Sequence, residues 1–238
     1  MAWSGAAKAD ATEPVIRIST SEWPPYTSQG LPGQGASSAL VRHVFQRAGY
    51  RVEITFFPFK RAVALAVNDP AYVGYMTEYD DPAVRQHFAF SAVIGVSPLG
   101  FAENAQAPVT WHSLEDLRGL RIGVVNGYVN TAAFDAMMQD GQLRTQGVDL
   151  DEINLRKLVV RHLDLAVIDG NVAAYLLATT EKGAPIRMNP HMLENKNLYI
   201  AFRHDPKVDA IRLAFDKAMR GIDPVKWQQA YIAKLSAH

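Results

Sequence analysis

The sequence contains no cysteine among its 238 residues. Disulfide bonds, thiolate catalysis and cysteine-based metal sites are therefore excluded. A chain without thiols suits an oxidising compartment, where stray thiols are a liability, although this absence does not identify the compartment.

The sequence also lacks a surplus of charge, because 24 Lys and Arg residues balance 24 Asp and Glu residues. Nucleic acids and anionic membranes attract proteins with a basic field, so neither is expected as a main partner. No apolar run approaches the roughly 20 residues that a membrane-spanning helix needs. A chain of this length with 48% hydrophobic residues is expected to form one large or two small globular domains.

Common catalytic and cofactor motifs are missing as well. The stretch 33–38 begins like a dinucleotide fingerprint, but Ser38 stands at the third glycine position. The stretch "GVSPLG" is one residue too long for a nucleophile elbow, and there is no P-loop. The seven histidines show no paired ligand spacing. We therefore expect no cofactor, no metal and no catalytic residues.

The N-terminal segment 1–13 has no apolar region that could act as a signal peptide. It does contain Ala7-Lys8-Ala9, an A-x-A pattern of the kind found at signal cleavage sites. Two interpretations stay open. The segment is either the remnant of a removed export signal behind an added Met1 or a disordered leader of small residues.

The hydrophobic pattern of the first half predicts alternating strands and helices. Val15–Thr20 alternates like a strand and leads into a loop rich in proline and glycine, after which Ser37 is expected to cap a helix. A strand at 52–58, a helix at 60–67 and a strand at 72–77 follow. This order predicts a parallel sheet covered by helices, and hence an α/β fold.

The alternation of predicted strands and helices begins again after residue 97. Ser113 is expected to begin a short capped helix with an acid at its third position. The remaining segments are predicted as a strand at 121–125, helices at 131–138 and 153–161, a strand at 163–169, a helix at 171–180, a strand at 198–203 and two amphipathic closing helices. Two α/β lobes are therefore expected, with ligands bound beyond the carboxyl ends of strands.

Six segments, taken in their order along the chain, resemble those of the bacterial extracellular solute-binding protein family 3, whose members are type II periplasmic binding proteins. They are "EWPPYT", "FFPFKRAVALAVND", "DPAVRQHFAFS", "SLEDLRGLRIGVVNGY", "NLRKLVVRHLDLAVIDGNVAAYLL" and the closing helices. The resemblance implies two lobes, 14–97 with 197–238 and 98–196, joined by two crossing strands. Such lobes close on a ligand by a hinge motion.

The resemblance also implies a function. It predicts a monomeric periplasmic protein, not an enzyme, that captures an amino acid or a related amine or acid and delivers it to an ABC transporter permease. Two alternatives stay open. One is a cyclohexadienyl dehydratase-like enzyme on the same fold, in which Glu22 or Glu78 would act as general acid with a pKa raised by desolvation. The other is a ligand-sensing module for a signalling partner.

Two candidate site regions match the family. Trp23 and Tyr26 in "SEWPPYT" would form an apolar cleft wall, and the intervening prolines limit the freedom of the loop before binding. Either aromatic alone could instead be a core residue. By resemblance Asp169 would bind a ligand ammonium group, although a lone Asp between a strand and a helix is also a competent N-cap.

A third region departs from the family at the arginine that usually grips a ligand carboxylate. Val84 occupies that register, and Arg85 follows one place later. A shift of one residue in a helix rotates a side chain by about 100°. Arg85 therefore either reaches the cleft after a loop adjustment or faces solvent. Arg61 either meets an anionic ligand group or covers the lobe surface with its aliphatic stem.

The fourth region is the turn after "RIGVV", where the family offers a glycine and small hydroxyl residues to a carboxylate. Gly127 fits, whereas Tyr128 and Val129 replace the hydroxyls, and Asn130 and Thr131 could supply donors or cap the next helix. These replacements suit a larger or less polar amine or acid. The candidate ligand-binding residues are Glu22, Trp23, Tyr26, Arg61, Glu78, Arg85, Tyr128, Asn130, Thr131 and Asp169.

Overall fold

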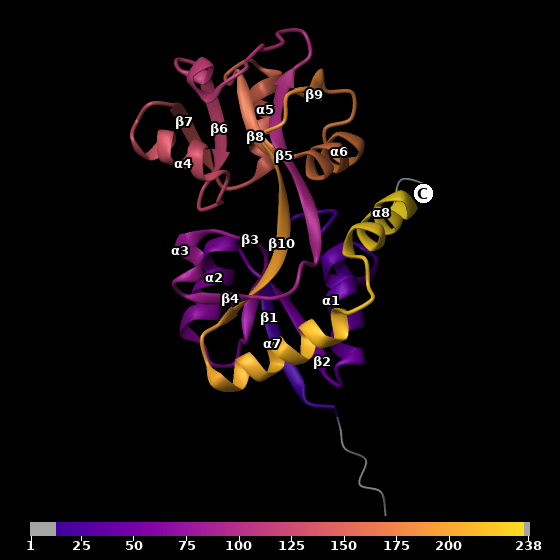
Figure 1. The fold of residues 1–238 in the computed structure, drawn as a ribbon. Coiled ribbons are helices and arrows are strands. Elements are labelled where there is room, and N and C mark those ends of the chain that lie inside the picture. The colour runs from indigo at the N-terminus through magenta and orange to yellow at the C-terminus, as the bar shows by residue number, and fades with distance from the viewer. Residues whose placement is uncertain (1–12, 236–238) are drawn as a thin grey trace, which may run out of the picture.

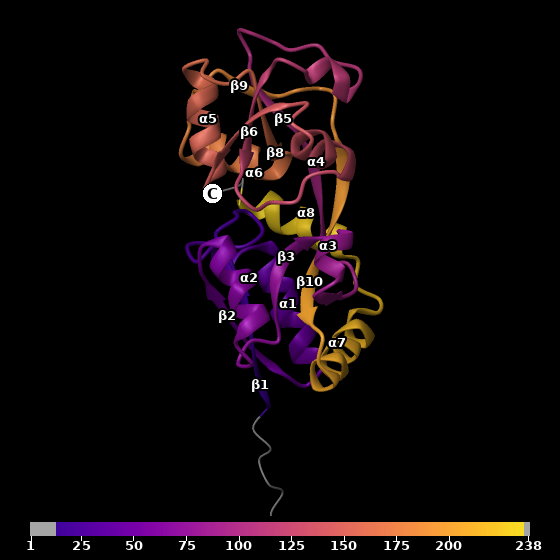
Figure 2. The same ribbon diagram turned by 90° about the vertical axis from the view of Figure 1, so that its left-hand side faces the viewer.

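A computed structural model of the chain describes residues 13–235. The leader expected at 1–13 lies, apart from its last residue, outside the described residues. Figure 1 shows two α/β bodies joined by extended strands, and Figure 2 shows that helices cover the sheet in both. The predicted two-lobe α/β architecture is therefore confirmed.

The first lobe holds a parallel group of strands in the order β2-β1-β3. Its elements are β1 (Val15–Thr20), η1 (Pro32–Gln34), α1 (Ala36–Arg47), β2 (Arg51–Phe56), α2 (Phe59–Asn68), β3 (Gly74–Tyr79), α3 (Pro82–Arg85), β4 (Phe88–Phe90), α7 (Pro206–Met219) and α8 (Pro224–Leu235). The carboxyl ends of β1 and β3 face the second lobe, so the loops that follow them meet it.

The second lobe has a parallel group in the order β8-β6-β7. Its elements are η2 (Leu114–Leu117), β6 (Arg121–Val125), α4 (Ala132–Gln139), β7 (Arg144–Val148), α5 (Asp151–Val159), β8 (Leu165–Asp169), α6 (Gly170–Thr179) and β9 (Ile186–Met188). Ser113 forms the expected capping box with Asp116 ahead of η2, which is a 3-10 helix.

Two ten-residue strands connect the lobes, β5 (Gly95–Asn104) and β10 (Glu194–Arg203). They pair antiparallel with each other, while β10 also pairs with β3 and β5 also pairs with β8. One continuous sheet therefore runs through both lobes. The boundaries expected at residues 97 and 196 fall inside these strands, and we propose that the lobes divide there.

The helix after the first loop differs from the prediction at its start. α1 begins at Ala36 with Gly35 as its N-cap, so the prediction that Ser37 caps it is wrong. Its apolar face is as expected, because Leu40, Val41 and their neighbours one turn later are fully buried. The end of the helix before Gly49, which has a φ of 83°, is also as expected.

Gly35 fixes the entry from the aromatic loop into α1. It has φ of 102° and ψ of 166°, and a Cβ there would lie 2.4 Å from the carbonyl oxygen of Tyr26. We expect Gly35→Ala to lower the free energy of unfolding by about 2 kcal/mol. Gly49→Ala is the matched control, because its Cβ would meet open space and only the left-handed conformation costs about 1 kcal/mol. Equal urea midpoints for the two variants would contradict the close approach.

No helix within residues 13–235 is long and apolar enough to cross a membrane.

Candidate functional site

The aromatic loop after β1 folds into a tight hydrogen-bonded turn at the lobe interface. The backbone N–H of Trp23 donates to the carbonyl of Thr27 at 2.7 Å, and the N–H of Tyr26 donates back to the carbonyl of Trp23 at 3.0 Å. The two rings lie 4.6 Å apart between centroids. Because the turn leaves its donors and acceptors paired, both aromatic rings are held at the end of β1.

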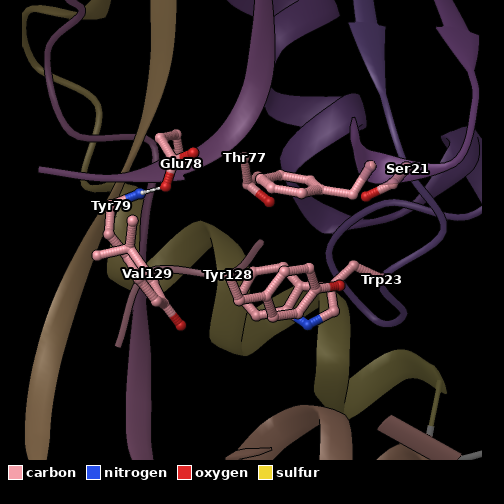
Figure 3. A pocket seen from close by; sticks show the side chains of 8 residues that line it. Ser21, Trp23, Thr77, Glu78, Tyr79, Tyr128 and Val129 are labelled. Atoms are coloured by element: carbon pink, nitrogen blue, oxygen red, sulfur yellow. Dashed lines mark hydrogen bonds between the residues drawn. The ribbon is translucent and has the colours of Figure 1, made fainter. Parts of the chain in front are cut away.

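The loop forms one wall of a cavity between the lobes (Figure 3). Eight side chains line it: Ser21, Trp23, Phe59, Thr77, Glu78, Tyr79, Tyr128 and Val129. Tyr128 comes from the second lobe and stands edge-on to Trp23 and to Phe59, at 6.4 and 5.1 Å between ring centroids. The free space is about 30 Å³, room for no more than about two water molecules. The cleft is therefore closed over aromatic side chains.

Glu78 is one of three buried carboxyl groups at this cleft. It lies at the end of β3 and is 5% exposed. Its oxygens accept from the hydroxyl of Tyr75 at 2.8 Å and from the backbone N–H of Tyr79 at 2.6 Å. Burial outweighs these bonds and raises the pKa of Glu78 to about 7. The direction agrees with the expectation that desolvation would raise the pKa of this carboxyl.

Asp151 is the second buried carboxyl, and it is not among the candidate residues predicted from the sequence. It is the first residue of α5, is 9% exposed and lines the inner end of the cleft. Burial and the nearby charge of Asp169 raise its pKa to about 7, against a hydrogen bond from the Trp23 side chain. That bond joins the two lobes, since Trp23 belongs to the first and Asp151 to the second.

Asp169 is the third, at the junction of β8 and α6, and it is 2% exposed. One carboxyl oxygen caps α6 by accepting from the N–H groups of Asn171 and Val172 at 2.7 and 2.8 Å. The other accepts from the hydroxyl of Tyr26 at 2.8 Å, a second contact between the lobes. Burial raises the pKa of Asp169 to about 6. The capping interpretation thus describes this side chain, which also lines the inner cleft.

Positive charge is scarce around these carboxyl groups. Among the described residues, no Lys, Arg or His lines the inner cavity or its deeper end. Lys196 of β10 does influence Glu78. Its Nζ lies 5.4 Å from the centre of the Tyr79 ring, and its charge only weakly opposes the raised pKa of Glu78. The cleft is therefore acidic and aromatic.

The two predicted arginines lie away from this cavity. Arg85 is exposed on α3, forms an ion pair with Asp80 and packs over the ring of Phe90. Arg61 is exposed on α2, with its guanidinium 5.2 Å from the centre of the Phe57 ring. The position of Arg85 matches its solvent-facing alternative, and that of Arg61 matches the alternative in which its side chain covers the lobe surface.

The remaining candidates are spread along the cleft. Glu22 is exposed at its mouth and accepts from the backbone N–H of Gln29 at 3.0 Å. Asn130 lines the deeper end, but its N–H groups donate to Asp135 at 2.7 and 2.8 Å. Thr131 caps α4 by accepting from the N–H of Phe134 at 3.2 Å. Tyr128 lines both the cavity and its deeper end.

Two α/β lobes, joined by antiparallel crossing strands and closing on a cleft, constitute the type II periplasmic binding protein fold, and this chain has it. The resemblance found in the sequence is confirmed in the fold. No family model matches the chain, and no curated protein matches it.

Several solved structures share the fold at low sequence identity. The GluR0 ligand-binding core from Nostoc punctiforme, in complex with L-glutamate, is 18% identical, with a TM-score of 0.72 over 92% of this chain and 98% of that one. The amino acid ABC transporter substrate-binding protein AbpA from Streptococcus pneumoniae, bound to L-arginine, is 14% identical, with a TM-score of 0.74 over 92% and 94%. A histidine kinase sensor domain is 16% identical, with a TM-score of 0.77 over 92% and 95%.

Proposed function

We propose that the chain is a solute-binding protein whose interlobe cleft captures a small organic amine. The observation that supports this most directly is the set of three buried carboxyl groups, Glu78, Asp151 and Asp169, beside aromatic rings and without a basic residue among the described lining. Burying an ionised carboxyl is costly unless a cation or hydrogen bonds compensate it. An ammonium group would supply both.

The aromatic side chains favour the same ligand. The faces of Trp and Tyr rings attract cations within about 6 Å, and the attraction is stronger where water is excluded. Trp23, Tyr79 and Tyr128 all line the inner cleft. An α-amino acid fits less well, because its carboxylate would be buried without the bidentate arginine that usually pairs with it. The proposed ligand is therefore an amine without a carboxylate.

The proposed role includes delivery of the amine, by a monomer in the periplasm, to an ABC transporter permease. AbpA, named as an ABC transporter substrate-binding protein, supports this role by analogy. The sensor-domain neighbour supports the alternative, in which closure on the same ligand signals to a kinase. Ligand capture is common to both.

The enzyme alternative has one observation in its favour, the pKa of about 7 that burial gives Glu78, which suits a general acid. Cyclohexadienyl acids, however, are anions. The three carboxyl groups of the cleft would repel them, whereas they attract an ammonium group. We therefore propose binding without catalysis.

The proposal predicts selective stabilisation by amines at pH 8. We expect n-butylamine and phenethylamine at about 100 times their Kd to raise the melting temperature by about 5–10 °C, the effect of about 2.7 kcal/mol on a chain of this size. L-glutamate and acetate should cause no shift. Differential scanning fluorimetry measures both.

Arg85→Ala is the matched control for this experiment, because Arg85 is exposed and paired with Asp80. It should respond to the amines like the parent protein. A shift with L-glutamate that Arg85→Ala removes would show that the arginine grips a carboxylate after all, and would overturn the amine proposal.

A further inference from the structure

A much larger groove lies beside the inner cavity, at the cleft mouth. The groove holds about 630 Å³, within the range of about 300–1,000 Å³ typical of ligand sites. Its walls come from the segment Phe56–Phe59 of the first lobe and from Leu150 of the second. Both lobes thus contribute apolar surface beside the acidic cavity.

The groove and the cavity adjoin. Ser21, Phe59 and Tyr128 line both, so only these side chains stand between a ligand seated among the carboxyl groups and the groove. The groove and the acidic cleft are also adjacent along the chain, because Leu150 of the groove directly precedes the buried Asp151 of the cleft. The small cavity accommodates a charged head, and the groove is the space available for the rest of the molecule.

We propose that the groove binds the apolar chain of the same ligand, so that the solute is an elongated amine with its head inside and an alkyl or aryl chain along the groove. This inference rests on the proposed amine-binding function. Four apolar side chains of the lining support an apolar occupant: Phe56, Phe57 and Phe59 are half-buried, and Leu150 is 52% exposed.

The charged residues of the groove are exposed to solvent and do not call for a second charged end. Glu22 accepts from the N–H of Gln29, and Asp149 accepts from the side chain of Asn126 at 3.0 Å. Lys60 adds a positive charge to the same lining. The apolar side chains, together with exposed charges of both signs, suit a hydrocarbon chain better than a second ammonium group.

The test is a chain-length series at pH 8, measured by isothermal titration calorimetry with methylamine, n-butylamine, n-hexylamine and n-octylamine. A methylene lying in an open groove buries about half of its surface, so affinity should rise about twofold per methylene. n-Octylamine should therefore bind about 16-fold more tightly than n-butylamine.

Leu150→Gln should reduce the octylamine-to-butylamine affinity ratio by about threefold, because a polar group replaces apolar wall. Val160→Gln is the matched control. Val160 is an apolar residue of similar exposure, 60%, that lies at the opposite end of α5 and outside the groove. It should leave the ratio unchanged.

The outcomes separate the two proposals. Equal binding of butylamine and octylamine would overturn the groove subsite while leaving amine binding intact. An unchanged ratio in Leu150→Gln would do the same and leave the groove to a protein partner. If no member of the series binds, the amine-binding function fails, and the groove inference fails with it.

Discussion

Glu78→Gln is expected to weaken n-butylamine binding by about 100-fold, which corresponds to the loss of one buried charge partner. The same variant should be more stable than the parent protein when no ligand is present. These opposite effects follow from one cause. The carboxylate attracts the bound cation, but without a cation its burial is unfavourable.

The expected stabilisation of the unliganded Glu78→Gln variant follows from the pKa of Glu78. Burial raises the pKa of Glu78 to about 7 from an ordinary value of 4.5, so the ionised group costs about 3 kcal/mol at pH 8, to order of magnitude. Glutamine keeps the local contacts, because its oxygen can accept from the N–H of Tyr79 and its amide can donate to the hydroxyl of Tyr75. Urea unfolding and calorimetry measure the two effects.

Glu53→Gln provides the matched control, since Glu53 is a partly exposed acid on β2 far from the cleft. It should change neither quantity appreciably. If Glu78→Gln lost stability and bound butylamine as before, Glu78 would be a structural group and the acidic cleft would not be the cation site.

The sequence predicts the fold well where hydrophobic periodicity is strong and poorly where strands are short or polar. The buried strands β1, β6 and β8 and the amphipathic α1 all follow from pattern alone. β7 (Arg144–Val148) escaped prediction because an edge strand carries few apolar residues. β4 and β9 have only three residues each, too few for an alternation to show.

The candidate site illustrates a different limit. Trp23 and Tyr128 could be selected from local motifs, and the structure places both at the cavity. Asp151 could not, because in the sequence it is one acid in the run 149–152 at a helix start, a common solvated position. Its burial depends on the opposite lobe, whose Trp23 covers it. The signal that could have found it is Leu150 beside it, an apolar residue in an otherwise acidic run.

Acidification from pH 8 to pH 5.5 is expected to stabilise the unliganded protein by about 5 kcal/mol, raising its melting temperature by about 10–20 °C. The pKa is about 7 for Glu78 and Asp151 and about 6 for Asp169 in the closed structure, all raised by burial. Unfolding returns these groups to ordinary values near 4. The closed form therefore binds more protons between about pH 4 and pH 7, so its stability falls as the pH rises through that window and levels off above it.

Other shifted carboxyl groups act outside this window. The pKa of Asp116, Asp164 and Asp205 is lowered by hydrogen bonds, so their contributions are lost only as the pH falls below about 4. Asp151 and Asp169 repel one another and so take up protons in sequence, which broadens the transition. Lys196, whose Nζ lies 5.4 Å from the centre of the Tyr79 ring, weakly opposes the raised pKa of Glu78.

A bound amine should flatten the pH dependence. The ammonium group favours the ionised carboxyl groups, so saturating n-butylamine stabilises the protein most at pH 8, and its affinity falls as the pH is lowered. Calorimetric melting at several pH values, with and without butylamine, measures the difference. The double variant Glu78→Gln with Asp151→Asn should lose most of the unliganded dependence. Two results would show that other groups set the pH dependence of stability. One is a melting temperature that falls from pH 8 to pH 5.5, and the other is an equal rise in the double variant.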